Sequence, residues 1–241
     1  SGITFRMDQG ECVGLIGPNG SGKSTLLMHL NGILPEHLPS PPKVSVFGLP
    51  VTEANLAEIR RRVGLLFQNP DDQLFCPTVS EDVAFGPEQL GEPSDMVRRR
   101  VLDALRRVDL AQAGERSPHH LSGGEKRRVC LAGVLALNPD ILALDEPTSD
   151  LDPRGERELI TLLRSLPATK IVASHDLELI VNLCPRVILL DAGRLVVDGP
   201  TSELLSDESL MLKHGLEKPH ILQHSHPHGA DKLRGPGSSS L

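Results

Sequence analysis

A glycine-rich stretch near the N-terminus decides the fold of this chain. It reads Gly17, Pro18, Asn19, Gly20, Ser21, Gly22, Lys23, Ser24, Thr25. This stretch fits the phosphate-loop pattern Gly-x4-Gly-Lys-Ser, and it lies between an apolar run at 12–16 and a periodic stretch at 24–30, a strand and a helix. Glycines let backbone N–H groups close around phosphate oxygens, and the helix dipole adds positive potential there. The stretch therefore predicts a nucleotide site in which Lys23 reaches the β- and γ-phosphates and Ser24 ligates Mg²⁺.

Two adjacent carboxylates, Asp145 and Glu146, follow a second apolar run at 141–144. In a doubly wound sheet this strand end lies beside the phosphate loop. Asp145 suits the hydration shell of the metal, and Glu146 points at the attacking water, where a carboxylate acts as general base or orients and polarises that water. Paired acids after a strand are otherwise commonly a solvated strand end. The neighbouring phosphate loop favours the catalytic interpretation.

Strand and helix patterns alternate on both sides of a helical stretch. Further strands are expected at 43–48 on an edge, 63–67, 170–173, 187–190 and 195–197, and further helices at 154–166, 176–183 and 201–205. Helical patterns at 80–89, at 94–108 and after Gly124 indicate an inserted helical subdomain at about 71–137. The fold class is α/β, a phosphate-loop NTPase with a RecA-like parallel-sheet core and an antiparallel β edge. We expect one domain over 1–219.

Composition narrows the function classes. The 241 residues have a net charge of -7, with five Phe and no Tyr or Trp, which argues against a nucleic-acid partner because binding and stacking need clustered Lys and Arg and aromatic rings. No apolar run approaches the length that crosses a bilayer. The four cysteines form no Cys-x-x-Cys pair, so we expect reduced thiols. Without an initiator Met or a signal pattern, the sequence is expected to be a fragment.

The segment Leu121, Ser122, Gly123, Gly124, Glu125 resembles the signature motif of the ABC ATPases. In that family the serine and the two glycines cap a helix and present N–H groups to a γ-phosphate. Glu125 stands where the family usually has Gln. Ser122 and Glu125 also fit an ordinary capping box. Both interpretations can hold, because the cap geometry is what makes the anion site.

Three further elements follow in the order of that family. Gln68 resembles the Q-loop glutamine, 149–152 resembles the D-loop, and His175 resembles the switch histidine. The chain is identified as a member of the ABC ATPase family over about 2–200. This resemblance implies ATP and Mg²⁺ as cofactors, with Ser24, Gln68 and Asp145 around the metal. It also implies a catalytic set of Lys23, Gln68, Glu146 and His175, in a head-to-tail dimer with a second copy or a paralogous ATPase.

Finer patterns are similar to one branch of the family. Segments 68–75, 77–79 and 82–87 look like the ATPases of energy-coupling-factor importers, and 121–128 with 132–136 look like their cobalt and nickel branch. This resemblance implies a peripheral subunit on the cytoplasmic face of the cell membrane, bound to integral membrane subunits. Import of another substrate such as a vitamin stays open. So does a soluble ABC ATPase acting on nucleic acid or ribosomes, although its usual coiled coil or second cassette is not visible here.

Two regions have two interpretations each. Leu74, Phe75, Val79 and Phe85 either border a groove for a helix of the membrane subunit or form the core of the helical subdomain. The stretch 220–241 is rich in His, Pro, Gly and Ser and is expected to be disordered. The histidines of this tail are His220, His224, His226 and His228. In one interpretation they bind Ni²⁺ or Co²⁺ together with His214, and in the other they belong to a solvated tail without a metal role.

The residue that stacks on adenine is not assigned. ABC ATPases normally place an aromatic residue in a strand some way upstream of the phosphate loop, and this sequence begins too late to include that strand. Phe5 is too close to Gly17 to be assigned that role.

Overall fold

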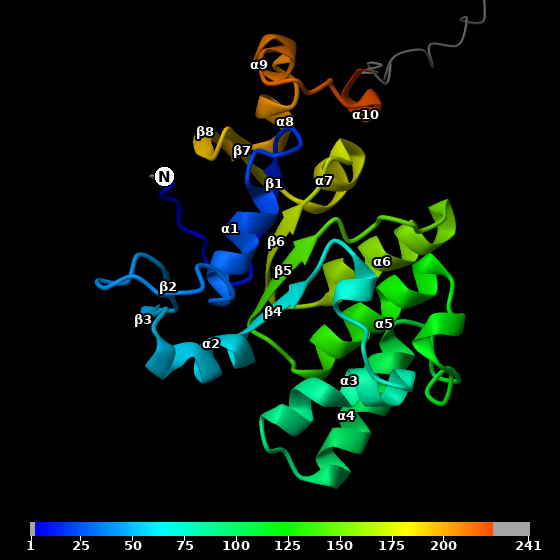
Figure 1. The fold of residues 1–241 in the computed structure, drawn as a ribbon. Helices are drawn as coiled ribbons and strands as arrows, with labels where there is room; N and C mark the ends of the chain where they lie inside the picture. The colour runs from blue at the N-terminus through cyan, green and yellow to red at the C-terminus, as the bar shows by residue number, and fades with distance from the viewer. Residues whose placement is uncertain (1–2, 224–241) are drawn as a thin grey trace, which may run out of the picture.

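The computed structural model describes residues 3–223 of the chain. A six-stranded sheet in the order β4-β5-β6-β1-β7-β8 runs through the molecule (Figure 1). Its strands are β1 (Cys12–Ile16), β4 (Val63–Leu66), β5 (Ile141–Asp145), β6 (Thr169–Ala173), β7 (Arg186–Asp191) and β8 (Arg194–Pro200). Neighbouring strands from β4 to β7 are parallel, and β8 pairs antiparallel with β7. The predicted α/β class with a parallel core and an antiparallel edge is confirmed.

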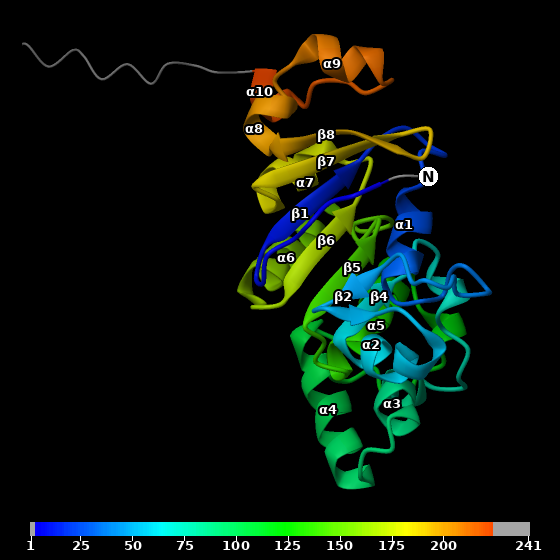
Figure 2. The same ribbon diagram turned by 90° about the vertical axis from the view of Figure 1, so that its left-hand side faces the viewer.

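Helices cover both faces of this sheet (Figure 2). They are α1 (Lys23–Leu30), α2 (Leu56–Arg62), α3 (Val79–Gln89), α4 (Ser94–Arg107), α5 (Gly123–Ala136), α6 (Pro153–Ser165), α7 (Leu177–Leu183), α8 (Thr201–Leu204), α9 (Glu208–Lys213) and α10 (His220–Gln223). Short 3-10 turns are η1 (Glu53–Asn55), η2 (Pro70–Asp72) and η3 (Pro118–His120). Among residues 3–223, no helix is both long and apolar enough to cross a membrane.

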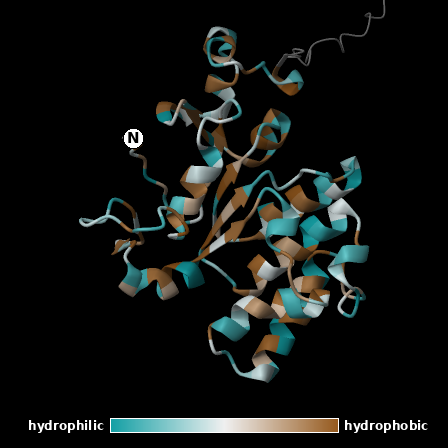
Figure 3. Cartoon of the chain, in the orientation of Figure 1, coloured by the Kyte–Doolittle hydropathy of each residue, from teal (hydrophilic) through white to brown (hydrophobic). Residues whose placement is uncertain are grey.

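The central strands consist mainly of apolar residues, and helices therefore bury both of their faces (Figure 3). Successive side chains of a strand point to opposite faces. Val13 and Leu15 therefore belong to the core cluster under α1 and α2, whereas Ile16 belongs to the larger cluster under α3 to α7. This two-sided burial holds the carboxyl ends of the strands, and the loops that follow them, in fixed positions.

Helices α3, α4 and α5 pack on one another at one end of the molecule, beyond β4, and α8 to α10 lie at the other end, beyond β7 and β8 (Figures 1 and 2). All three helices of the first group lie within 71–137. The boundary of a subdomain there stays a prediction. Helix α5 also contacts β4, which links this group to the sheet.

Two local predictions were wrong. The single strand expected at 43–48 is a hairpin of β2 (Ser45–Val46) and β3 (Leu49–Pro50), because Phe47 and Gly48 have φ values of 51° and 75°, and two successive left-handed residues turn the chain. Disorder from about His220 is wrong for α10, where Leu222 packs on the main core. The rest of the expected tail, 224–241, lies outside the described residues.

The four thiols are free. Two of them are neighbours in space, since the Sγ atoms of Cys12 and Cys184 are 3.5 Å apart. The two cysteines are 172 residues apart in the sequence, so the sequence alone does not predict this contact. It arises because β1 pairs directly with β7, and Cys184 lies just before β7 begins.

Candidate active site

The glycine-rich loop joins β1 to α1 at the carboxyl edge of the sheet. Gly17 has a φ of 148°, and a Cβ atom there would lie 2.0 Å from the carbonyl oxygen of Leu190, so a side chain does not fit. Gly22 precedes α1 in a left-handed conformation, with a φ of 99°. Within the described residues no side-chain oxygen caps α1. The first N–H groups of this helix are therefore available to an anion.

Lys23 and Ser21 both suit a phosphate group. Lys23 is buried, and its Nζ donates hydrogen bonds to the carbonyl oxygens of Gly17 at 2.8 Å and Pro18 at 3.2 Å. Burial lowers the pKa of Lys23, and the nearby carboxylates of Glu146 and Asp145 oppose that shift. The Ser21 hydroxyl is buried without a hydrogen-bond partner among the described residues. The loop thus holds an ammonium and an unused hydroxyl where ATP phosphates would bind.

Asp145 ends β5 beside this loop. Burial raises the pKa of Asp145, while a side-chain hydrogen bond with Ser24 opposes the shift. A carboxylate and a hydroxyl in contact are the hard oxygen ligands that Mg²⁺ prefers. Gln68 follows β4, the neighbour of β5, and is exposed. The metal residues expected from the sequence therefore fit Mg²⁺ at Asp145 and Ser24, and the side-chain role of Gln68 stays a prediction.

Glu146 is fixed from three sides. Its N–H donates to the carbonyl oxygen of Ala173 at 2.9 Å, and its carboxylate accepts hydrogen bonds from the Ser174 hydroxyl at 2.9 Å and the His175 N–H at 2.9 Å. The His175 ring Nδ1 lies 2.8 Å from Oε1 of the same carboxylate. Strand β6 ends beside β5, so Glu146 and His175 meet although 29 residues separate them. The structure thus brings two of the expected catalytic residues into direct contact.

The signature segment forms the capping box that the sequence predicts. The Ser122 hydroxyl accepts a hydrogen bond from the Glu125 N–H at 3.2 Å, and the Glu125 carboxylate accepts one from the Ser122 N–H at 2.9 Å. Gly123 and Gly124 pack against Asp150, where a Cβ atom on either would come within 3.2 Å of it. Residues 122–125 and 150–152 line a cavity of about 650 Å³, together with other residues that include Arg128 and Arg154. Its anion-binding role stays a prediction.

The two halves of the expected site lie apart within one chain. The phosphate loop, the two carboxylates and His175 gather at the carboxyl ends of β1, β5 and β6. None of the residues lining the signature cavity comes from 17–25. Ser122, Gly123 and Gly124 are therefore not brought to the phosphate loop of their own chain.

Sequence reasoning missed Arg127. This arginine of α5 is only 2% exposed, donates to the carbonyl oxygens of Phe67 at 2.7 Å and Gln68, and lies 4.0 Å from the Asp150 carboxylate. Burial lowers its pKa. Helical spacing could have predicted its burial, because residues 127, 131 and 134 lie on the core face of α5. A charged residue on that face needs buried partners.

Gln73 was also missed. Its side chain accepts a hydrogen bond from the Phe67 N–H at 3.2 Å and donates one to the Cys130 carbonyl oxygen at 3.1 Å. Gln73 and Arg127 together fasten the loop after β4 to α5. No sequence signal separates Gln73 from the neighbouring Gln68.

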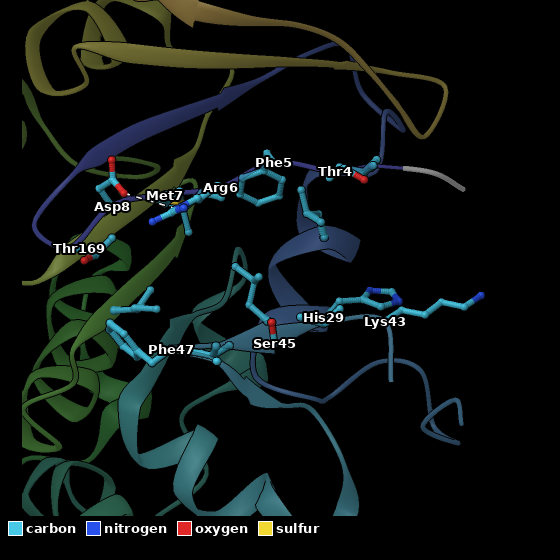
Figure 4. A pocket seen from close by; sticks show the side chains of 18 of the residues that line it. Thr4, Phe5, Arg6, Met7, Asp8, His29, Lys43, Ser45, Phe47 and Thr169 are labelled. Carbon is cyan, nitrogen blue, oxygen red and sulfur yellow. Dashed lines mark ion pairs between the residues drawn. The ribbon is translucent and has the colours of Figure 1, made fainter. Parts of the chain in front are cut away.

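A second large cavity, of about 660 Å³, lies away from this site (Figure 4). It separates the N-terminal segment 3–9 from α1 and from β2, and Phe5, His29 and Ser45 face it from these three parts. Phe5, Leu26 and Leu30 each pack against the smaller core cluster. None of the phosphate-loop residues lines this cavity.

Comparison with known proteins shows the family of the chain. The family model described as ABC transporter matches residues 1–149. The chain belongs to this ABC transporter family. The energy-coupling factor transporter ATP-binding protein EcfA of Methanothermobacter thermautotrophicus is 47% identical over 223 residues, which cover 90% of this chain and 71% of that protein.

Solved ABC structures agree with this assignment. The cbiO1 protein of Clostridium perfringens, part of the ABC transporter complex cbiONQ, has a TM-score of 0.75 and 36% identity, covering 92% of this chain and 90% of that one. A dimeric ATP-binding cassette in a post-hydrolysis state, bound to ADP and Pi, has a TM-score of 0.72 and 28% identity, covering 82% and 88%. The chain is an ABC ATPase, an ATP-binding and hydrolysing subunit of a transporter.

Proposed function

We propose that this ABC ATPase powers a membrane importer for cobalt or nickel ions, and that it works as a head-to-tail dimer. The observation that carries the dimer is the separation of the phosphate loop from the signature cavity within one chain. A closed two-fold dimer brings the signature of each copy to the phosphate loop of the other. The cassette captured with ADP and Pi is also dimeric.

In this proposal each half of the site has its own task. The phosphate loop and Lys23 bind the ATP phosphates, and the signature of the second copy closes over the γ-phosphate. Ser24, Asp145 and Gln68 would hold Mg²⁺, which would neutralise charge on the phosphates when bound. Glu146 orients the attacking water and accepts its proton. The His175 ring contacts the Glu146 carboxylate and adds to the bonds that hold it.

The Glu146→Gln variant tests this function. The amide keeps the shape of the side chain but cannot accept a proton, so ATPase turnover should fall by about 10²- to 10⁴-fold while ATP still binds. The dimer should accumulate in sedimentation with Mg-ATP. Glu203→Gln, an exposed change on α8, is the control and should behave as wild type. Turnover near the wild-type rate in Glu146→Gln would contradict the assignment.

The proposal of an importer, and of its substrate, is supported by the relatives of the chain. EcfA is named as an energy-coupling factor ATP-binding protein, and cbiO1 as part of a transporter complex. By analogy we propose integral membrane subunits as partners and a peripheral position on the cytoplasmic face of the cell membrane. Uptake of Co²⁺ and Ni²⁺ by the assembled transporter, compared with vitamin uptake, decides the substrate. ATPase activity stimulated by DNA or ribosomes, without a membrane partner, would favour the soluble alternative.

The docking site for the membrane subunit is proposed at Phe75 and Phe85. These rings are 64% and 41% exposed and stack edge to face with centroids 4.8 Å apart. Val79 is fully buried and Leu74 packs on the core. The core interpretation is therefore right for Val79 and Leu74, and the groove interpretation is kept for the two exposed rings, which follow the Gln68 loop.

The histidine-rich tail is proposed as a local reservoir for Ni²⁺ or Co²⁺, with the transport site in the membrane. His224, His226 and His228, which lie outside the described residues, offer imidazoles at close spacing. His214 is removed from this set, because its Nδ1 lies 2.7 Å from the Asp191 carboxylate and the side chain is largely buried.

A further inference from the structure

The signature segment carries a negative charge close to the place where a phosphate would bind. Glu125 is at the third position of α5 and lines the signature cavity together with Ser122, Gly123 and Gly124. A carboxylate beside the γ-phosphate of ATP would repel it, because like charges in contact destabilise a complex strongly. A nearby positive charge is needed to offset this repulsion.

Arg116 supplies a positive charge next to the Glu125 carboxylate. Its Nη1 donates to Oε1 of Glu125 at 2.8 Å, while Oε2 of the same carboxylate accepts from the Ser122 N–H at 2.9 Å and the Ser122 hydroxyl at 3.1 Å. Both carboxylate oxygens are thus turned back onto the chain. These bonds, with that of Ser122 the largest cause and that of Arg116 the next, lower the pKa of Glu125 to about 2, so the group stays ionised.

Two of the three basic residues that follow Glu125 in this segment are engaged elsewhere, and the third, Arg128, lines the signature cavity. Lys126 pairs with Asp71 at 2.6 Å, and Arg127 is buried against the carbonyl oxygens of Phe67 and Gln68. Among the described residues, Arg116 is the cation within 4.0 Å of the Glu125 carboxylate. The direct ion pair of Glu125 is therefore made by Arg116, and Arg128 forms no ion pair with this carboxylate among the described residues.

The backbone holds Arg116 in this position. Its carbonyl oxygen accepts a hydrogen bond from the Val79 N–H at 3.0 Å, at the start of α3, and its N–H donates to the Ala113 carbonyl oxygen at 2.9 Å. The second guanidinium nitrogen, Nη2, donates to the carbonyl oxygen of His120 at 3.3 Å. The guanidinium therefore approaches Glu125 with its geometry already set.

We propose that Arg116 is a positioning residue for the signature, which neutralises Glu125 and holds its carboxylate against Ser122 so that the N–H groups of Gly123 and Gly124 can receive a γ-phosphate. In the ATP-bound dimer the Ser122 hydroxyl turns from Glu125 to that phosphate, while Arg116 keeps the carboxylate in place. This inference rests on the proposed dimer, in which the phosphate comes with the second copy.

A double-mutant cycle tests the role of Arg116. Arg116→Ala should lower ATPase activity and ATP-driven dimer formation by about tenfold or more, because the Glu125 charge is then exposed to the phosphate. Glu125→Gln removes the charge but keeps a side chain that completes a capping box, and it serves as the second arm of the cycle. The double variant should recover most of the ATPase activity and dimer formation that Arg116→Ala loses. Arg99→Ala, which removes an exposed pair with Asp95, is the control and should match wild type.

Salt separates this role from a merely structural one. The Arg116→Ala defect should shrink at high ionic strength, because exposed charges are screened there. Wild-type behaviour of Arg116→Ala, or a defect that neither Glu125→Gln nor salt relieves, overturns the proposal. A wild-type chain that hydrolyses ATP without ever associating contradicts the proposed dimer instead, so the two failures are distinguishable.

Discussion

Glu146 combines backbone strain with a fully engaged carboxylate. Its φ of 47° is unusual for a residue with a side chain, and such conformations cost about 1–3 kcal/mol. The bonds to Ala173, Ser174 and His175 offset this cost. Because two of these bonds use backbone groups of β6 and its following loop, the carboxylate position depends on the sheet more than on the His175 ring.

His175→Ala should therefore separate activity from stability. The ring is 71% exposed, so we expect ATPase activity to fall by about 10²-fold while the free energy of unfolding stays within about 0.5 kcal/mol. Ser174→Ala is the matched comparison. It removes a buried partner of Glu146 and should cost about 1–3 kcal/mol. Urea unfolding and ATPase rates measure both; a large loss of stability in His175→Ala would refute this division.

At the scale of elements, α5 serves two functional loops at once. Its N-terminus carries the signature, and four residues into the helix Arg127 holds the loop after β4 that contains Gln68. Arg127 also approaches Asp150 of the D-loop segment. A movement of α5 would therefore displace the Gln68 loop and the signature together.

Arg127→Met tests this coupling. The carbonyl oxygens of Phe67 and Gln68 would lose their donor, which should cost about 2–4 kcal/mol of unfolding free energy. ATPase activity should fall as well, because the Gln68 loop is released. Arg98→Met, an exposed change on α4, should have little effect on either quantity. Equal stability of Arg127→Met and Arg98→Met in urea would argue against a structural role for Arg127.

Phe75→Glu tests the docking surface proposed for the membrane subunit. Because the ring is 64% exposed, the variant should fold and hydrolyse ATP on its own but lose copurification with the membrane subunit. Leu212→Glu, at a residue 62% exposed on α9, is the matched control and should still copurify. Unfolding of Phe75→Glu would favour a core role instead, and normal copurification would remove Phe75 from the interface.

Most elements were predictable because they follow hydrophobic periodicity, and the misses have local causes. The strands at 12–16 and 141–144 and the helix at 154–166 lie within a residue of their structural bounds. The β2–β3 hairpin was missed because Phe47, not a usual turn residue, adopts a left-handed conformation. Helix α9 was missed because it is six residues long and amid polar sequence. Ser174 was missed because its role appears only when β6 is paired with β5.

At the scale of the whole molecule, the two ends of the sheet carry different tasks. Helices α3 to α5 lie beyond β4, and the signature and the exposed rings lie on these helices and the loops before α3 and α5. Helices α8 to α10 lie beyond β8 and lead to the histidine-rich tail (Figure 2). The His214 contact with Asp191 fastens α9 close to the turn whose Gly193 N–H donates to the Ser21 carbonyl oxygen at 3.0 Å. The C-terminal helices are thus tied to the phosphate-loop end of the sheet.

Metal titration examines the tail. A variant in which His224, His226 and His228 are replaced by Ala should bind Ni²⁺ and Co²⁺ more weakly than the full chain in isothermal titration, because neutral imidazoles are the ligands it loses. ATPase activity should be unchanged. His37→Ala, far from the tail in sequence, is the control. Identical titrations of the triple variant and the full chain would remove the tail from metal binding.

Mixing two inactive variants tests whether the site is shared between copies. Lys23→Ala loses the phosphate-loop lysine, and Ser122→Arg fills the signature cavity, so each homodimer has two defective sites. In a mixed dimer the intact loop of the Ser122→Arg copy meets the intact signature of the Lys23→Ala copy. Equal mixing should restore ATPase activity to about a quarter of the wild-type rate, since half of the dimers are mixed and each has one complete site. Sedimentation with Mg-ATP should show dimers in the mixture. If both variants fold, as judged by circular dichroism, and the mixture stays inactive and monomeric, the head-to-tail dimer is wrong.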